Sequence, residues 1–581
     1  MIKNLIKVGL VSCLVLSVCG CQDQQTELKE ETNQNFESFV DELPSRIYAD
    51  DSLSVNQLFI NPENYNIETG LAEWYEYDID NMQESNELFD DIYTELCEFD
   101  RELLNETNQE TYDVLDVAFS EIPFEIEDEN YYYLDNNPLG EFSGVYNDIL
   151  MTLYFYTLKD SKDMASYVNL IDTLDEYAVS LLEFEKERQS HGYGMSQQEI
   201  NDVIGMINSM LETADLNFIV DDFITDTDEL TDIEISEIEN YQKSVKENAI
   251  NQIVLFYETI LEGLEEIEPQ YKEIMPIAKL NSGQEYFASI VYSGSGFADM
   301  DEYKEYIDTK LEEAIDEYVA FDDGLDLSKL YNGEVDLYAA ESMNEVLDYL
   351  SVAMQEDFPN IEGINYQVES LPVSLRELMP NVGAFYMVGA VDCPNCKQQI
   401  VLNGDYHPTD FITLAHEGYP GHMYQHSYVN RTDLPMIRKI LSFSDYTEGY
   451  ANYVQRYVTK YTNNEELAEY FTAYERFLYF LILQIDYQVN YLGQDGSEIF
   501  EVFFDVPKEE IKNDELYQQI VLTPGSFVMY YVAGSRFDDL HEMVNMAAHE
   551  DVSDREFHES ILKHGNIPMN LLEEYVLEEY R

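Results

Sequence analysis

The chain has 581 residues, of which 45% are apolar, and contains 47 Tyr and 29 Phe but a single Trp. This is enough apolar material for a large packed core, which excludes disordered and fibrous proteins. Lys and Arg number 30 against 118 Asp and Glu, giving a formal net charge of −88. Such a charge repels nucleic acid and anionic lipid head groups, so we expect no nucleic-acid partner. It also attracts cations, although a solvated acidic surface is the simpler explanation of the composition.

The first residues have the pattern of an export signal. Two lysines precede an apolar run from Val8 to Val18, which is too short to span a bilayer. The segment Val18-Cys19-Gly20-Cys21 resembles a bacterial lipobox, in which cleavage after Gly20 leaves Cys21 as a lipidated N-terminus. We therefore expect a signal peptide over residues 1–20 and an extracytoplasmic protein anchored to the bacterial cell membrane only through Cys21. Simple secretion is the alternative.

The predicted body of the protein begins with helices. Residues 21–34 are polar and charged with little to bury, which predicts a flexible tether between the lipid and the folded part. Beyond them, apolar residues recur at steps of three and four, which predicts buried helix faces. Two such stripes are Tyr167, Ile171, Leu174, Ala178 and Leu181, and Ile250, Ile253, Val254, Tyr257, Ile260, Leu261 and Leu264, the second of which ends before Pro269. We place a helical N-terminal lobe over residues 35–280.

The second lobe, over residues 281–581, is predicted to combine a small sheet with further helices. Short β-prone runs occur between residues 288 and 403, namely Ser289–Tyr292, Ile364–Val368, Ala384–Met387 and Ile400–Leu402. Helical periodicity returns after Thr409 and continues to the C-terminus. No Pro/Gly/Ser-rich linker marks the boundary between the lobes, and the sequence does not indicate an oligomeric state.

Few cysteines remain after removal of the signal peptide. Cys97, Cys393 and Cys396 are the ones left besides Cys21, so the chain is not a disulfide scaffold. The segment Cys393-Pro394-Asn395-Cys396 fits either a small loop closed by a disulfide or half of a metal knuckle. We favour the disulfide, because the sequence shows no second half of a knuckle.

Four of the nine histidines, His407, His416, His422 and His426, lie within twenty residues, and Glu417 follows His416 directly. In the His-Glu-x-x-His helix of zinc peptidases, two imidazoles four residues apart share a metal, with the adjacent Glu as base. Here the spacing is six, which places His422 about 120° away from His416 on a straight helix. Pro420 and Gly421 disrupt helical geometry, so we expect the helix to bulge or break there.

The segment Thr413–Gln425 resembles the signature of the bacterial domain-of-unknown-function family 885, whose members are often lipoproteins and are regarded as zinc metallopeptidases. Glu448-Gly449-Tyr450-Ala451 is similar to the family's Glu-Gly-Trp-Ala segment. Pro524–Tyr531 and Phe557–Pro568 resemble its C-terminal motifs, and the match covers roughly residues 35–575. The resemblance implies a mainly α, two-lobed fold with a small sheet beside an active-site cleft, like that of zinc peptidases whose third ligand is Glu.

The resemblance also implies roles for individual residues. His416, His422 and Glu448 would bind one Zn²⁺ per chain, and Glu417 would be the general base. Three protein ligands leave a fourth zinc position for water, whose pKa zinc lowers from 15.7 to about 7. Tyr530 or Tyr531 would donate a hydrogen bond to the oxyanion of the tetrahedral intermediate. Which of the two faces the site stays open, because the family's usual spacing to the next Gly is not kept.

Other residues near the motif have weaker claims to a role. His426 lies four residues after His422 and offers an alternative same-face pair, although a surface position is the simpler interpretation. His407 is either a loop residue or a hydrogen-bond donor to substrate. Asp445 is a candidate to orient a ligand imidazole. The remaining downstream histidines are predicted to be structural: His541, His549, His558 and His564.

The function indicated is a zinc-dependent metallopeptidase that hydrolyses extracytoplasmic peptides. The alternatives are a non-catalytic lipoprotein that binds peptide or metal, and a zinc amidase acting on another amide such as cell-wall material. Glu417 favours catalysis, because a binding protein does not need a base beside the metal. We further expect Gln399–Asn403 to be an edge strand to which an extended peptide adds, with Asn403 or His407 near the metal.

Overall fold

The computed structural model describes residues 20–120, 130–321, 325–361, 363–376, 382–504, 507, 511, 514–548 and 552–581. The expected signal peptide lies outside these residues except for its last position, Gly20, and so does His549. Within the described ranges, helices make up most of the chain, and three short strands form one sheet. The mainly α fold with a small sheet is therefore confirmed.

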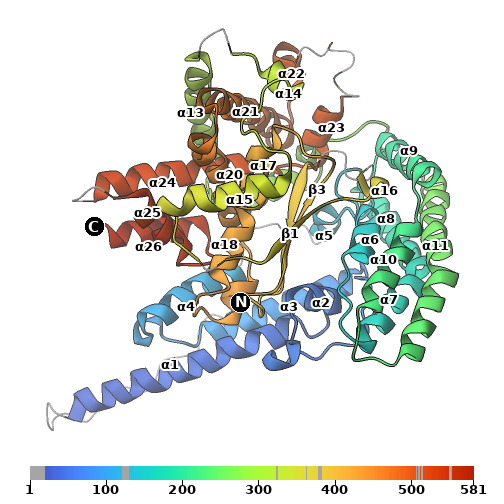
Figure 1. Cartoon of the computed structure of the whole chain (residues 1–581), viewed down its shortest axis with the longest axis horizontal. Coiled ribbons are helices and arrows are strands. Elements are labelled where there is room, and N and C mark those ends of the chain that lie inside the picture. The colour runs from blue at the N-terminus through green and yellow to red at the C-terminus, as the bar shows by residue number, and fades with distance from the viewer. Residues whose placement is uncertain are drawn as a thin grey trace, which may run out of the picture.

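Helices up to residue 266 build the lower and right-hand parts of the molecule in Figure 1. They are α1 Gly20–Ile47, α2 Ser52–Leu58, α3 Ile79–Leu96, α4 Glu106–Phe119, α5 Tyr131–Asp135, α6 Ile149–Tyr154, α7 Ser161–Asp172, α8 Leu174–His191, α9 Gln197–Thr213, α10 Asn217–Asp228 and α11 Ile235–Glu266. The later helices are α12 Gly283–Ser295, α13 Met300–Val319, α14 Leu327–Tyr331, α15 Met343–Ala353, α16 Val373–Arg376, α17 Asp410–Glu417, α18 His422–Val429, α19 Met436–Ile440, α20 Ser444–Tyr457, α21 Glu465–Asp486, α22 Ser497–Phe504, α23 Glu515–Leu522, α24 Ala533–Ala547, α25 Asp554–Leu562 and α26 Met569–Glu579.

α1 differs from the sequence expectation, because it includes residues 21–34, which we predicted to be a flexible tether. This segment is rich in Glu, Gln and Lys, which are strong helix formers. Side chains 26–31 are exposed, Asn33 is hydrogen-bonded to Leu103, Asn105 and Asn108, and apolar packing begins at Phe36. Figure 1 shows this end of α1 projecting from the body at the lower left. The segment is thus a polar helix that extends from the packed part of the chain.

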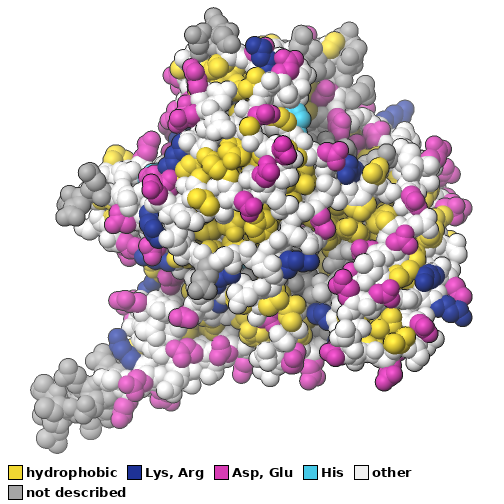
Figure 2. Space-filling view, viewed as in Figure 1, with side chains coloured by type: hydrophobic (Ala, Val, Ile, Leu, Met, Phe, Trp, Pro, Cys, Tyr) yellow, Lys and Arg dark blue, Asp and Glu magenta, His cyan; other side chains and the backbone are white. Residues whose placement is uncertain are grey.

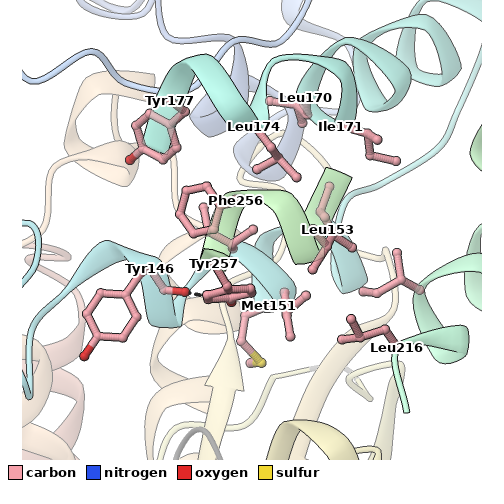
Figure 3. Packing of buried hydrophobic residues seen from close by; sticks show 14 of the residues in the cluster. Tyr146, Met151, Leu153, Leu170, Ile171, Leu174, Tyr177, Leu216, Phe256 and Tyr257 are labelled. Atoms are coloured by element: carbon pink, nitrogen blue, oxygen red, sulfur yellow. Dashed lines mark hydrogen bonds between the residues drawn. The ribbon is translucent and has the colours of Figure 1, made fainter. Parts of the chain in front are cut away.

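The apolar stripes of the first half form buried helix faces, as predicted. The stripe over residues 250–264 lies on α11, which ends at Glu266 ahead of Pro269. The earlier stripe continues across two helices, α7 and α8, which meet at Thr173. Figure 3 shows this core, where the hydroxyl of Tyr257 donates to the carbonyl of Tyr146 at 3.0 Å. That hydrogen bond satisfies a phenol that is 1% exposed.

The hydrophobic core continues across the boundary that we expected near residue 280. One cluster contains Phe287 and Tyr303 from beyond the boundary together with Phe184 and Tyr193 from before it. Another cluster, built mainly from residues 330–576, also includes Val114 of α4. Side chains from the two halves of the sequence are therefore packed into shared clusters.

The sheet consists of β1 Tyr366–Ser370, β2 Ala384–Met387 and β3 Gln398–Leu402, in the order β1-β3-β2. β3 is parallel to β1 and antiparallel to β2. The predicted run Ser289–Tyr292 is instead part of α12. Four residues do not distinguish a strand from a helix turn, and the buried Phe287, Ala288 and Val291 fit the helical period.

β3 is the central strand, so our prediction that Gln399–Asn403 forms a free edge is wrong. Ile400, Val401 and Leu402 are all buried, which is typical of a strand covered on both faces. Only two residues of β3, Gln398 and Gln399, are polar, and Gln398 is buried as well. The edge strand on the antiparallel side is β2.

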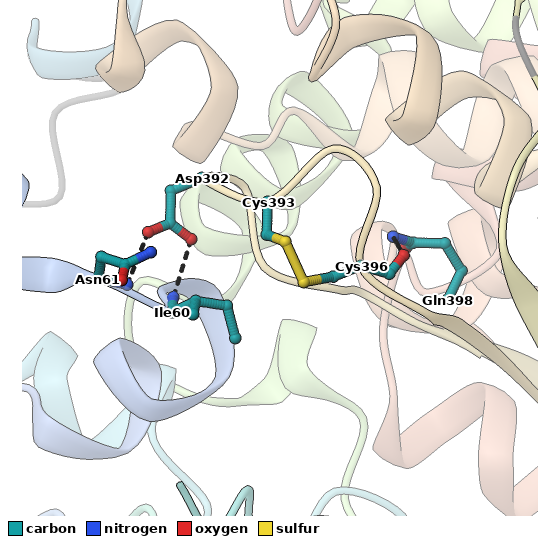
Figure 4. Close-up of a disulfide and its surroundings, with 6 residues drawn as sticks. All are labelled: Ile60, Asn61, Asp392, Cys393, Cys396 and Gln398. Carbon is teal, nitrogen blue, oxygen red and sulfur yellow. Dashed lines mark hydrogen bonds between the residues drawn. A yellow bond between two sulfur atoms is a disulfide. The ribbon is translucent and has the colours of Figure 1, made fainter.

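The loop before β3 contains the disulfide that we favoured, between Cys393 and Cys396 (Figure 4). The preceding carboxylate, Asp392, accepts hydrogen bonds from the backbone N–H groups of Ile60 at 2.8 Å and Asn61 at 2.7 Å. The loop is thereby fastened to the segment that follows α2. Cys97 is a free, exposed cysteine.

Acidic side chains are spread over the face seen in Figure 2, with fewer Lys and Arg among them. This distribution agrees with solvated surface acidity as the source of the net charge. Among the described residues, no single helix is long and apolar enough to cross a bilayer, while α9 and α10, bent by 64°, pass the same test of length and composition as a pair.

Candidate metal centre and its cleft

The chain breaks between α17 and α18 at the positions that the sequence indicated. α17 ends at Glu417 and α18 begins at His422. Between them, the N–H of Gly421 donates to the carbonyl of Ala415 at 2.9 Å, six residues back instead of four. A Cβ on Gly421 would lie 1.7 Å from the carbonyl oxygen of His416, so only glycine fits there. The predicted break is confirmed.

The break brings His416 and His422 together with Glu448 of α20. The two imidazole Nε2 atoms are 3.1 Å apart. Oε2 of Glu448 lies 3.5 Å from Nε2 of His416 and 3.3 Å from Nε2 of His422. Corners of a tetrahedron around a metal with bonds near 2.0–2.1 Å are about 3.3 Å apart. The three atoms therefore have the spacing of three ligands of one tetrahedral ion.

Glu417 is a second carboxylate within reach of the same histidines. Its ligand atom lies within 4.8 Å of those of His416 and His422, and Oε1 is 3.9 Å from Nε2 of His416. Its other oxygen accepts the backbone N–H of Tyr386 at 2.8 Å. Of the two carboxylates, Glu448 has the better position for a third ligand, because its oxygen is nearer to both imidazoles and Glu417 is held by β2. Glu417 would then lie beside a bound metal ion without coordinating it.

Two glycines allow α20 to carry Glu448 close to the histidines. A Cβ on Gly449 would lie 2.7 Å from Cβ of Ala533, and one on Gly534 would lie 2.4 Å from Oδ1 of Asn452. α20 and α24 therefore approach each other more closely than larger residues would permit. Tyr450 adds a direct link, because its buried hydroxyl donates to the carbonyl of Pro420 at 2.9 Å.

The two carboxylates have opposite protonation tendencies. Burial raises the pKa of Glu417 to about 7, an effect that His416 opposes and Glu448 reinforces. Burial also acts to raise the pKa of Glu448, but the neighbouring His422 and His416 outweigh it and hold that pKa well below its usual range. Glu448 is thus the stable anion of the pair, which suits a ligand. Glu417 is suited to exchanging a proton, which is the requirement for a base.

Of the two tyrosines, Tyr530 has its hydroxyl near Glu448 and Glu417, whereas the hydroxyl of Tyr531 is bonded to Tyr479. Burial and the nearby Glu448 and Glu417 raise the pKa of Tyr530, so its hydroxyl keeps its proton. The ring of Tyr531 stacks on that of Tyr479 with centroids 3.8 Å apart. Both tyrosines belong to the π-helical turn Val528–Val532. π-Turns often occur at functional sites, where they alter the direction of side chains.

Two cavities meet at the cluster. The smaller cavity, of about 640 Å³, includes Gln425, His426, Lys439, Glu448 and Asn566 in its lining. The larger cavity, of about 1160 Å³, includes Glu141, Asp148, Asp202 and Glu515. Among the described residues, both are lined by Val382, Gly383, Ala384, His416, Glu417 and Tyr530. An extended molecule lying across the cluster would therefore enter both cavities.

The other histidines that we considered do not supply ligands to the cluster. His426 is held by the hydroxyl of Tyr386 at 2.7 Å from Nδ1 and by Asn430 at 3.1 Å from Nε2. His407 bonds to Thr409 at 2.8 Å and lines neither cavity, so its proposed place near the metal is not supported. Each of the remaining described ones has a structural contact: His541 with Phe557, His558 with Tyr453 and the carbonyl of Asp357, and His564 with Glu110 and Glu579.

Two further candidates have other contacts. Asp445 accepts the backbone N–H of Met569 at 2.9 Å, so it fixes the start of α26 instead of holding a histidine of the cluster. Asn403 lines neither cavity, and its backbone N–H donates at 2.8 Å to the carbonyl of Gly383, which lines both.

Sequence reasoning missed the role of β2 in the site. The backbone N–H of Tyr386 holds Glu417, and its hydroxyl bonds to His426 and Gln398. The β-prone run Ala384–Met387 predicts the strand, but nothing in the run distinguishes Tyr386 as the residue that contacts the motif helix. Its role depends on the order of strands in the sheet.

Two solved structures are similar in fold. The chain resembles the putative lipoprotein from Colwellia psychrerythraea with a TM-score of 0.77 and 14% identity, over 94% of this chain and 99% of that one. A putative lipoprotein of unknown function from Shewanella oneidensis matches with a TM-score of 0.54 and 11% identity, over 96% and 99%. No curated protein matches the chain. The family model described as "Bacterial protein of unknown function (DUF885)" matches residues 66–576, and the chain belongs to this family.

Proposed function

We propose that the protein is a zinc-dependent metallopeptidase that hydrolyses extracytoplasmic peptides. The observation that carries this proposal is the convergence of His416 Nε2, His422 Nε2 and Glu448 Oε2 at mutual distances of 3.1–3.5 Å. Two imidazoles and one carboxylate are the ligand set of a catalytic zinc site that keeps one position open. Zinc held there would increase the acidity of a water molecule and polarise a substrate carbonyl.

The surrounding residues fit the proton transfers of amide hydrolysis. Glu417 is positioned by the backbone N–H of Tyr386 and lies beside the ligands, where it would take a proton from the attacking water and pass it to the leaving amine. Tyr530 lines both cavities and keeps its hydroxyl proton, so it would donate a hydrogen bond to the oxyanion.

The free edge of β2 is the proposed support for the peptide backbone. Gly383 and Ala384 line both cavities, and β2 is paired with β3 on its other side. The N–H of Tyr386 points to Glu417 and therefore away from β3. An extended substrate would add beside Ala384 through main-chain hydrogen bonds, which do not depend on side-chain identity.

The location follows from the lipobox-like segment that ends at Cys21. The two proteins of similar fold are described as putative lipoproteins, which supports the same location for this chain. We propose that lipidated Cys21 anchors the protein outside the cytoplasm. The helical residues 21–34 would then hold the body away from the bilayer.

A peptide library tests the proposed reaction. Purified protein should cleave members of a mixed peptide library, and a chelator should stop cleavage until zinc is returned. Glu417→Gln should retain zinc and lower turnover by about 10²-fold or more, the usual effect of losing a general base. Binding of peptides without cleavage would indicate the non-catalytic alternative. Cleavage restricted to cell-wall amides would indicate the amidase.

A further inference from the structure

The two cavities that meet at the cluster differ in charge. Apart from the cluster, the larger cavity is lined by the carboxylates of Glu141, Asp148, Asp202 and Glu515, and none of its described lining residues is Lys or Arg. The smaller cavity has no carboxylate besides Glu417 and Glu448 among its described lining residues, and Lys439 is the one Lys or Arg there. The electrostatic potential therefore changes from one side of the cluster to the other.

Lys439 has an unusual environment for a chain with 118 acidic and 30 basic residues. Its ammonium donates to the carbonyls of Asn430 at 3.3 Å and Thr432 at 2.7 Å, and its carboxylate neighbour Asp433 favours the charge from beyond the distance of an ion pair. An ammonium has three N–H donors, so these two carbonyls leave one donor available. Arg438, the preceding residue, is by contrast paired with Glu110.

The lining of the smaller cavity offers further polar groups around Lys439. Gln425 is 3% exposed, and its side-chain Nε2 makes no close hydrogen bond in the described structure, with the hydroxyl of Tyr446 near enough to interact with the side chain. Asn566 also lines the cavity and donates to the backbone carbonyl of Lys439 at 3.3 Å. A buried amide without a close hydrogen bond costs free energy, which a ligand acceptor would offset.

We propose that Lys439 and Gln425 bind a carboxylate of the substrate in the smaller cavity, with the adjoining peptide bond at the cluster. This inference rests on the proposed peptidase function and specifies its substrate class. The substrates are peptides that have a carboxylate on the carboxyl side of the cleaved bond, which is the part released as the amine. The group bound is either the terminal carboxylate or the side chain of Asp or Glu. The terminal carboxylate is present on every peptide and needs no particular sequence.

The larger cavity supports the same orientation of the peptide. Those of its carboxyl groups that are ionised repel a substrate carboxylate and favour an amino terminus or a basic side chain. Oε2 of Glu141 and Oδ2 of Asp202 are buried there without a hydrogen-bond partner in the described structure. A peptide would thus lie with its amino side over the larger cavity and its carboxyl side over the smaller one.

A comparison of free and blocked carboxyl termini tests the proposal. The probes are a random pentapeptide library with free carboxyl termini, the same library as C-terminal amides, and an amidated library with Glu fixed at one position. Lys439→Met should raise KM for free-acid peptides by roughly 10- to 100-fold, the range for losing a hydrogen bond to a charged group, with little change for amides. Lys439→Arg should retain most of the preference. Rescue by the Glu-containing amides would identify the side chain as the bound group.

Controls separate this inference from the proposed function and from folding. Lys243→Met removes one exposed charge on α11 and should not alter the acid-to-amide ratio. Calorimetry on the zinc-free protein should show the same preference in binding, because the carboxylate contact does not require turnover. Cleavage without any preference, or a preference that Lys439→Met leaves intact, would overturn the inference while the peptidase proposal stands. Absence of cleavage with an intact binding preference would overturn the peptidase proposal instead.

Discussion

Two clusters of histidine and carboxylate side chains are centred on residues of the C-terminal half of the chain, and the second also includes Glu110 of α4. In the first, His416, His422 and Glu448 direct one atom each to a common point beside two cavities. In the second, His564 lies between two carboxylates, with Nδ1 at 3.2 Å from Glu110 and Nε2 at 3.1 Å from Glu579.

The second cluster also contains a cation. Arg438 is fully buried and donates to Glu110 at 3.1 Å and to the carbonyl of His564 at 2.6 Å. Charges are therefore paired within the protein, and both ring nitrogens of His564 are in use. In the first cluster, one carboxylate oxygen and one nitrogen of each imidazole converge on one point, and no described Lys or Arg is bonded to them. Both clusters contain histidine and carboxylate, so residue type alone does not indicate a metal site, and the convergence of ligand atoms is the feature that sets the first cluster apart.

The largest expected difference between the clusters is in zinc binding. His416→Ala and His422→Ala should each remove zinc, because each deletes one of three protein ligands. His564→Ala should retain about one zinc per chain. Elemental analysis of the purified proteins measures this directly. Retention of zinc in both ligand variants would place the metal elsewhere.

A substitution in the second cluster should lower the stability of the protein without affecting zinc binding. Arg438→Met leaves Glu110 buried with one partner fewer, and the loss of one member of a buried ion pair typically costs about 3–5 kcal/mol in the free energy of unfolding. Zinc content should be unchanged. Chemical denaturation with elemental analysis tests both statements. A change below about 1 kcal/mol would show that the second cluster does not hold α4 and α19 together.

The two tyrosines of the π-helical turn are expected to differ in their effect on activity. Tyr530→Phe should lower kcat by about 10²-fold, the effect of losing one oxyanion donor, with little change in zinc content. Tyr531→Phe should keep most of the activity, since that ring stacks on Tyr479. Steady-state kinetics on peptides that the wild type cleaves tests the pair. Equal effects of the two variants would contradict the assignment.

The smallest expected effect is the pH dependence of the second cluster. Burial acts to lower the pKa of His564, but hydrogen bonds to Glu110 and Glu579 outweigh it and raise the pKa. The contribution of His564 to stability is then complete below its unfolded pKa of about 6.5 and is lost as the pH rises through the higher folded value. The stability difference between wild type and His564→Gln should be larger at pH 6 than at pH 9. A constant or growing difference would contradict the ion pairs.

The sequence predicts the local geometry of the first cluster well. Pro420 and Gly421 indicate a helix break from their backbone properties alone, and the structure has it between Glu417 and His422. The ligand Glu448 is harder to predict, because Glu is common in so acidic a chain. Its choice depended on the resemblance of the segment around it to a known family.

Features that depend on long-range packing could not be read from the sequence with the same success. The β-prone runs gave the three strands but not their order, so we expected β3 at the edge where β2 lies. The contact of Tyr386 with Glu417 depends on that order. Residues 21–34 illustrate a different limit, because low hydrophobicity predicts a lack of packing but does not exclude a helix.

Anomalous X-ray scattering at the zinc edge tests whether His416, His422 and Glu448 hold one zinc ion. Crystals of the purified, zinc-loaded protein should show one strong peak per chain, about 2.0–2.2 Å from His416 Nε2, His422 Nε2 and Glu448 Oε2. His564 should show no peak. A peak at another group of ligands, or no peak between these three atoms at full zinc loading, would contradict the account.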